Sequence, residues 1–312
     1  MIEPRIAVLI PCWNEAAAIV HVIEGFRASL PGARIYVYDN NSTDDTVSIA
    51  TACGAIVRTE PQQGKGAVVR RMFRDIEADF YVMVDGDNTY DASVAPRLLE
   101  LAIGLRCDLV NCIRRESEDS AYRAGHRWGN MMLTGAVRRI FGNRIHDMLS
   151  GYKVFSRRFV KSFPITSIGF GIETELTVHA LELDMPVEHL EGEYRGRMEG
   201  STSKLRTWSD GFKILVLIAQ LFKYERPLAF FSFLGAVLVV LSTALGTPLF
   251  IEYLRTGLVP RFPTGILAVG VMLLGFLGFV TGLILDTVTR GRREVKMLAY
   301  LTNPIYDESS DP

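Results

Sequence analysis

Several features that mark whole protein classes are missing from this chain of 312 residues. Basic residues are not in excess, because 34 Lys and Arg stand against 35 Asp and Glu, and this balance disfavours a general nucleic-acid binder. The patterns GxxxxGK[ST] and GxGxxG are both absent, so P-loop hydrolysis and dinucleotide redox chemistry are not indicated. The N-terminal residues lack the basic start and long apolar core of a signal peptide.

Cysteine is scarce, and its spacing does not favour metal binding. No CxxC pair occurs among the four cysteines, which are Cys12, Cys53, Cys107 and Cys112. Scattered cysteines without metal-ligand spacing are typical of small residues in a hydrophobic core. We therefore expect neither a zinc site nor disulfide bonds.

Charged residues are absent from two long stretches near the C-terminal end, Leu228–Ile251 and Thr264–Leu285. Each stretch is close to the ~20 residues that carry a helix across ~30 Å of hydrocarbon. A short spacer that contains two prolines separates them. We predict two membrane-spanning helices, 228–251 and 264–286, joined as a hairpin; a pair of buried core helices is the alternative.

Basic residues flank these stretches and indicate their orientation. Lys223 and Arg226 precede the first stretch, and the basic residues that follow the second are Arg290, Arg292, Arg293 and Lys296. Because basic flanks tend to stay on the cytoplasmic side, we expect both termini there. The sequence thus predicts a multi-pass protein of the cytoplasmic (inner) membrane, with the residues before about 225 on its cytoplasmic face.

The N-terminal part alternates between strand-like and helix-like patterns. Short apolar runs predict strands at 5–10, 34–38, 55–58 and 80–84. Helical spacing falls between them, at 16–29, 46–53 and 65–76. This alternation predicts an α/β domain with a doubly wound, mostly parallel sheet. Ligands bind such sheets at the carboxyl ends of the strands, so the polar residues after each strand are the candidates for a site.

Asp85-Gly86-Asp87 follows the strand FYVMV directly. Carboxylates at positions i and i+2 can face one hard cation, and Mg²⁺ is usually held by one or two carboxylates together with phosphate oxygens. A simple polar turn is the alternative, because Asp and Gly are favoured in turns. The other strand ends also carry polar residues, and this convergence favours a site.

The other polar residues lie after the remaining predicted strands. Asn14 and Glu15 follow the first strand, and Asp39 follows the second. Gln63-Gly64-Lys65-Gly66 opens the helix after the third. Glycines allow close approach of the backbone, and the N-terminus of a helix with a lysine favours a phosphate. A glycine loop that only caps the helix is the alternative.

Six ordered segments resemble the inverting glycosyltransferases of family two. Three lie in the first part of the chain: PCWNE (11–15), VYDNNSTDDT (37–46) and VDGD (84–87). Three more resemble the polyprenyl-phosphate subgroup, which includes dolichol-phosphate mannose synthases and bactoprenol glucosyltransferases: DMLSGYKVFSRR (147–158), GFGIETEL (169–176) and YRGRMEGSTSKL (194–205). The resemblance covers residues 5 to about 225 and implies the GT-A fold.

The resemblance implies roles for particular residues. The nucleotide would be contacted by Pro11, Asn14, Glu15, Asp39, Lys65, Asp85 and Gly86. Asp85 and Asp87 would bracket Mg²⁺ or Mn²⁺, and Asp87 and Asp147 would be the catalytic pair. The acceptor phosphate would be met by Arg123, Arg127, Arg197, Ser203 and Lys204. Asn40 stands where the family has a second Asp, which leaves recognition of the base and ribose open at this position. Thr89 stands where mannose synthases often have Gln, so the third protein ligand stays open.

The implied reaction is inverting transfer of a hexose from a nucleotide-diphosphate sugar, a UDP-sugar being favoured, to polyprenyl (undecaprenyl or dolichyl) phosphate. The acceptor phosphate is largely ionised near neutrality, since phosphate groups have a second pKa of about 6. Asp147 is therefore either a base or a residue that orients the sugar or a cation. A processive polysaccharide synthase-like transferase and a non-enzymatic membrane scaffold or flippase component are the alternatives.

These inferences divide the chain into four parts. A GT-A catalytic domain is expected at 1–204, a juxtamembrane amphipathic helix at 205–226, the two spans within 227–289, and a cytoplasmic tail at 290–312. The helix after 205 fits either the membrane interface or the core of the domain. Because relatives of this subgroup form oligomers, we expect a homo-oligomer, for example a tetramer. The product is expected to be a precursor of a cell-envelope glycan.

Overall fold

The computed structural model describes residues 3–116, 131–132, 134–135, 137–139, 144, 146–164, 171–196 and 207–306, without the side chains of 207–215. The chain forms two compact units. One comprises Met1–Ile214 together with Val295–Pro312, and the other comprises Leu215–Glu294.

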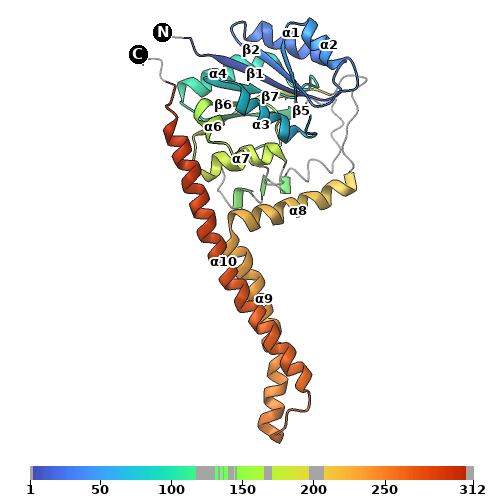
Figure 1. Ribbon diagram of the computed structural model, residues 1–312, viewed down its shortest axis with the longest axis vertical. Coiled ribbons are helices and arrows are strands. Elements are labelled where there is room, and N and C mark those ends of the chain that lie inside the picture. Colours follow the sequence, from blue (N-terminus) through green and yellow to red (C-terminus); the bar gives the residue numbers. More distant parts are fainter. Residues whose placement is uncertain are drawn as a thin grey trace. The chain divides into compact units, whose positions relative to one another are not determined.

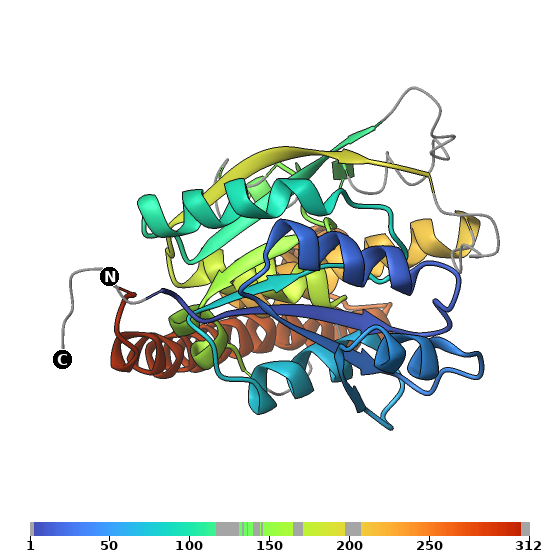
Figure 2. The same ribbon diagram turned by 90° about the horizontal axis from the view of Figure 1, so that it is seen from above.

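A seven-stranded sheet forms the centre of the first unit (Figures 1 and 2). Its strands are β1 (Ile6–Cys12), β2 (Arg34–Asp39), β3 (Ile56–Thr59), β4 (Phe80–Met83), β5 (Leu109–Glu116), β6 (Lys153–Ser156) and β7 (Val187–Tyr194). They lie in the order β3-β2-β1-β4-β6-β5-β7. Strand β6 is antiparallel to both of its neighbours, whereas the other pairs are parallel. The predicted α/β class with a mostly parallel sheet is confirmed.

Helices cover both faces of this sheet, because successive side chains of each strand point to opposite sides. In β1, Val8 and Ile10 belong to one hydrophobic core, and Ala7 and Leu9 belong to the other. The first core is closed by α1 (Ile19–Ser29), α2 (Thr46–Ala52), η1 (Ala92–Val94) and α4 (Ala95–Gly104). The second is closed by α3 (Lys65–Asp75), α6 (Arg157–Ser162) and α7 (Ile172–Glu182).

The reversal of β6 decides what lies at the carboxyl edge of the parallel strands. Because β6 runs against β4, its first residue, Lys153, pairs with Met83 near the end of β4. The segment that leads into β6, from Asp147 to Tyr152, therefore lies at the same edge as the ends of β1, β2 and β4. Residues distant in sequence are thus brought to one edge of the sheet.

Residues 295–306 pack against the first unit on the side of α6 and α7. Tyr300 donates a hydrogen bond of 2.7 Å from its hydroxyl to Oδ2 of buried Asp108. Arg158 pairs with the same carboxylate and lies over the Tyr300 ring at 4.7 Å. Lys296 pairs with buried Glu182, and Tyr306 stacks edge-on against Phe80 at 5.5 Å. The chain after the second apolar stretch is therefore part of this unit.

The second unit is built from long helices. Helix α8 spans Thr207–Glu225, α9 spans Pro227–Thr256 and α10 spans Phe262–Thr302, the last reaching into the first unit. Small residues at heptad spacing are buried where α9 and α10 meet: Gly235 and Ser242 on α9, and Ala268, Gly275 and Gly282 on α10. A Cβ at Gly235 would lie 2.7 Å from the Gly275 carbonyl oxygen, so the two backbones are in close contact.

Most side chains of α9 and α10 are exposed rather than packed in a core. In the most apolar window of each helix, 11% and 17% of the residues are buried. Both helices are long and apolar enough to cross a membrane. Their exposure disfavours the alternative of two buried core helices.

We predict that Tyr300→Phe lowers the free energy of unfolding by about 2 kcal/mol, the usual value of a hydrogen bond to a charged group. The ring and its contact with Arg158 are retained, so the loss reports the bond to Asp108 alone. Thermal unfolding of the full chain in detergent would measure the change, with exposed Tyr253→Phe as the matched control. An unchanged midpoint for Tyr300→Phe would show that the hydrogen bond to Asp108 does not stabilise the first unit.

Candidate active site at the carboxyl ends of the strands

The turn after β4 holds Asp85 and Asp87 next to β1. Gly86 lies against this strand so closely that a Cβ would come within 2.7 Å of the Cys12 sulfur. Asp87 is buried, and its Oδ1 accepts hydrogen bonds from the Thr89 amide at 3.2 Å and the Thr89 hydroxyl at 2.6 Å. Glycine between the two carboxylates is thus required by packing, and Thr89 orients Asp87.

Asp85 is partly exposed and belongs to a cluster of charges. The Lys65 ammonium contacts Asp85 Oδ1 and lies 2.6 Å from Oε1 of Glu173, the second residue of α7. Burial opposes the ammonium charge, but Asp85 and Glu173 outweigh it and hold the pKa of Lys65 above its ordinary value. Burial raises the pKa of Asp85, and its neighbours Asp87 and Glu173 add to this effect. The cluster therefore carries an excess of negative charge.

Asp147 lies in a second ion pair at the same edge. Arg114 of β5 forms a bidentate pair with the Asp147 carboxylate, donating from Nε to Oδ2 at 2.8 Å and from Nη2 to Oδ1 at 2.9 Å. Burial favours the neutral acid, but the Arg114 hydrogen bonds and charge prevail and hold the pKa of Asp147 below its ordinary value. A paired carboxylate with a lowered pKa is a weak proton acceptor, so the geometry favours a positioning role.

Lys153 is fully buried at the start of β6. Its ammonium donates to Asn111 Oδ1 at 2.6 Å, and the Asn111 amide donates to the backbone carbonyl of Asp147 at 2.8 Å. Burial lowers the pKa of Lys153 to about 8, although the Asp147 and Glu173 carboxylates oppose this shift. Lys153 and Asn111 thus fix the backbone of the Asp147 segment.

The turns after β1 and β2 are joined by hydrogen bonds. The Asn14 backbone amide donates to the Ser42 hydroxyl at 2.9 Å, and the side-chain Oδ1 of Asn14 accepts from the Thr43 backbone amide at 2.8 Å. Buried Asp39 accepts from the Ser42 amide at 3.2 Å. Two of the residues expected at the nucleotide, Asn14 and Asp39, are therefore joined through Ser42.

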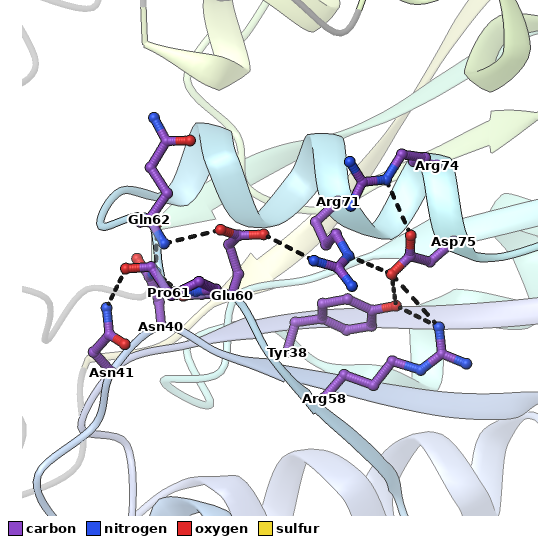
Figure 3. Close-up of polar contacts among 10 residues, drawn as sticks. All are labelled: Tyr38, Asn40, Asn41, Arg58, Glu60, Pro61, Gln62, Arg71, Arg74 and Asp75. Atoms are coloured by element: carbon purple, nitrogen blue, oxygen red, sulfur yellow. Dashed lines mark hydrogen bonds and ion pairs between the residues drawn. The ribbon is translucent and has the colours of Figure 1, made fainter.

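Asn40 and Asn41 hold the loop that leads from β3 to Lys65 (Figure 3). The Asn40 amide donates to the carbonyls of Glu60 and Gln62 at 2.8 Å, and its Oδ1 accepts from the Gly64 amide at 2.7 Å. Asn41, with a positive φ of 64°, donates to the Pro61 carbonyl at 2.9 Å. An aspartate at position 40 could not donate to two carbonyls, so the departure from the family pattern has a structural reason.

A cleft of about 540 Å³ opens beside Lys65, between the start of α3 and the start of α7. Its lining is rich in basic side chains, namely Lys65, Arg70, Arg71 and Arg74. Figure 3 shows Arg71 between Glu60 and Asp75, with which it pairs. Lys65, Arg70 and Arg74 are likewise paired with carboxylates, so the cleft is lined by ion pairs next to the carboxylate cluster.

The five residues expected to bind the acceptor phosphate all lie outside the described residues: Arg123, Arg127, Arg197, Ser203 and Lys204. The segment that carries the last three begins at the site, since the Arg195 amide donates to the Thr89 carbonyl at 2.8 Å. Tyr194, just before it, forms a bridge with Tyr90.

Arg114, Asn111 and Lys153 were not predicted from the sequence. A lysine within the apolar run YKVF is the one sign that pointed to Lys153, because a charged residue in a buried strand needs a partner. Arg114 has no comparable sign, since it depends on the pairing of β5 with the segment before β6.

Residues 7–163 match the family model described as Glycosyl transferase family 2. Glycosyltransferase AglJ of Haloferax volcanii is 32% identical over 249 residues, which cover 80% of this chain and 81% of AglJ. The low-salt glycan biosynthesis hexosyltransferase Agl6 of the same organism is 29% identical over 250 residues, covering 77% of this chain and 60% of Agl6.

Glucosyl-3-phosphoglycerate synthase from Mycobacterium tuberculosis, solved in complex with Mn²⁺, UDP-glucose and phosphoglyceric acid, is among the solved structures to which the chain is similar. The TM-score is 0.57 at 25% identity, and the match covers 70% of this chain and 79% of the synthase. The GT-A fold predicted from the motifs is thereby confirmed.

We predict that Asn40→Asp displaces the 60–64 loop, because a carboxylate would face two carbonyl oxygens without a proton to donate. The Michaelis constant for the donor should rise roughly tenfold or more, since one lost pairing is commonly worth about 1–3 kcal/mol. Initial rates at varied donor concentration would measure this. Glu24→Gln, which exchanges a carboxylate for an amide on the exposed face of α1, is the matched control and should leave the constant within about twofold.

Lys153→Met is expected to change how stability depends on pH. The pKa of Lys153 is lowered in the folded chain to about 8, so the unfolded chain binds more protons above this pH. Stability of the unsubstituted chain should therefore rise relative to Lys153→Met from about pH 8 to pH 10, by up to ~1.4 kcal/mol per pH unit. Unfolding midpoints at pH 7, 8, 9 and 10 would show this trend, and a constant difference would contradict it.

Proposed function

Because this chain belongs to glycosyl transferase family 2 and is a glycosyltransferase with hexosyltransferase relatives, we propose that it transfers a hexose from a UDP-sugar to polyprenyl phosphate. The transfer takes place with inversion, at the cytoplasmic face of a membrane. The observation that carries the proposal is the cluster of Asp85, Asp87 and Lys65 at the strand ends. It offers both oxygen ligands and a cation for a sugar diphosphate.

A divalent cation fits the donor set at this turn. Asp85 and Asp87 supply only oxygen atoms, which suit Mg²⁺ or Mn²⁺. Among the described residues no group of three or more His, Cys, Asp or Glu is arranged to hold a metal ion. The protein would thus supply two ligands, and phosphate oxygens of the donor would supply others. Mn²⁺ and UDP-glucose in the similar synthase support this assignment.

Positive side chains would stabilise the leaving group. Negative charge builds on the nucleoside diphosphate as the bond to the anomeric carbon breaks, and fixed cations nearby lower the barrier. Lys65 stands at the N-terminus of α3, and Arg70 lines the adjoining cleft. When bound, Mg²⁺ or Mn²⁺ would add charge neutralisation at the diphosphate.

Asp147 would position the reactants rather than remove a proton. The acceptor phosphate is already largely ionised near pH 7, and Arg114 keeps Asp147 ionised and fixed. A single displacement by a phosphate oxygen on the face opposite the leaving group inverts the anomeric centre.

The lipid acceptor is supported by the apolar helices and the basic segments. Helices α9 and α10 are each long enough to cross a membrane, which would keep the site near a lipid substrate. Arg123, Arg127, Arg197, Ser203 and Lys204 are proposed to bind the acceptor phosphate. The segment carrying the last three starts beside the Asp87 turn, where Arg195 bonds to Thr89.

The test is transfer of label from a panel of radiolabelled nucleotide sugars to lipid. Full-length protein with Mg²⁺ and polyprenyl phosphate should move label from one UDP-hexose into the organic phase. Asp87→Asn should lower this rate by about 10²-fold or more, because charge stabilisation at the diphosphate is lost. Asp91→Asn, on the same loop, is the matched control and should retain activity.

Three results would contradict the proposal. Label in no lipid product, for any donor, would remove the lipid acceptor. Label passing to phosphoglyceric acid instead would place the chain with the soluble-acceptor synthase. A growing polymer would favour a processive synthase.

A further inference from the structure

Lys65 contacts one oxygen of Asp85, a carboxylate that we propose as a ligand of the divalent cation. Its ammonium contacts Asp85 Oδ1 and, at 2.6 Å, Glu173 Oε1. The three side chains come from α3, the β4 turn and α7, and each is between one fifth and one third exposed. The contact is therefore reachable from solvent, so an ion from solution can compete for it.

The Asp85 carboxylate also lies close to Gly151. A Cβ on residue 151 would lie 2.1 Å from Asp85 Oδ2 and 2.9 Å from Oδ1, so a side chain at this position would displace the carboxylate. Gly151 is itself fixed, because its amide donates to the Tyr90 hydroxyl at 2.8 Å. Asp85 thus lies between Gly151 and Lys65, and its Oδ1 is the oxygen that Lys65 contacts.

The Lys65 ammonium is shared by two carboxylates, those of Asp85 and Glu173. Asp87 follows Asp85 by two residues on the same turn. A divalent ion on Asp85 and Asp87 would balance the charges of these two carboxylates. It would also repel a lysine that stayed in contact with Asp85.

We propose that Lys65 and the divalent ion compete for the Asp85 carboxylate. Lys65 pairs with Asp85 in the free enzyme, and it moves to the donor diphosphate when the ion binds Asp85. Glu173 keeps the ammonium within reach during this exchange. The inference rests on the proposed cation-dependent donor site. Binding of the cation and binding of the nucleotide are then cooperative, because the nucleotide provides the anionic partner that Lys65 needs after it leaves Asp85.

Mn²⁺ binding to the full-length protein in detergent, without nucleotide, tests the exchange. Free Mn²⁺ is followed by electron paramagnetic resonance. Lys65→Met should bind Mn²⁺ tighter than the unsubstituted chain by roughly tenfold or more, since a competing positive charge is gone. Lys65→Arg, which keeps the charge, should stay within about threefold of the unsubstituted chain. Added UDP should then tighten Mn²⁺ binding in the unsubstituted chain more than in Lys65→Met.

Arg71→Met provides the matched control. It removes one positive charge from the same helix, but Arg71 pairs with Glu60 and Asp75 rather than with Asp85. Its Mn²⁺ affinity should not change. Equal tightening in Lys65→Met and Arg71→Met would reduce the effect to net charge and overturn the proposal. Equal or weaker binding by Lys65→Met, with an unchanged thermal midpoint, would also overturn it.

This titration contains neither sugar donor nor lipid acceptor. If label transfer fails but Lys65→Met binds Mn²⁺ more tightly, only the proposed lipid acceptor is contradicted. If label transfer succeeds but Lys65→Met has unchanged Mn²⁺ affinity, only the proposed exchange at Asp85 is contradicted.

Discussion

Charge balance at one edge of the sheet is the constraint on which the site depends. Carboxylates that leave water must be paired, because an isolated buried charge costs several kcal/mol. Here Asp147 is paired with Arg114, and Asp85 and Glu173 share Lys65. The Asp147–Arg114 pair is bidentate and mostly buried, whereas Asp85, Glu173 and Lys65 are partly exposed and include two carboxylates for one ammonium. The buried pair is therefore suited to positioning, and the partly exposed group is suited to binding a ligand.

The reversed strand β6 makes this arrangement possible. In a fully parallel sheet, the segment before a strand lies at the edge opposite the carboxyl ends. Because β6 runs the other way, Gly151 and Lys153 stand beside the end of β4. The close contact of Gly151 with Asp85 and the link from Lys153 through Asn111 to Asp147 both follow from this single reversal.

The Asn40–Asn41 pair shows how a departure from a family pattern can be explained by local chemistry. Asn40 uses its amide both as donor and as acceptor to hold the loop before Lys65, which a carboxylate cannot do. The resemblance to the family leaves nucleotide recognition open at this position. The hydrogen bonds of Asn40 explain instead how the loop before Lys65 is held in place.

The sequence by itself determined the α/β class, the strands and helices of the first 85 residues, the family, and the two apolar helices. These follow from local periodicity and from short motifs, which can be recognised without knowing which residues are neighbours in space. The tertiary structure alone decided the partner of Asp147, the burial of Lys153, the position of Lys65 between two carboxylates and the packing of residues 295–306. Each of these depends on segments more than 30 residues apart in sequence, such as Arg114 and Asp147, and on the direction of one strand. Such pairings leave no periodic pattern in the chain, because they are fixed by sheet order rather than by neighbouring residues.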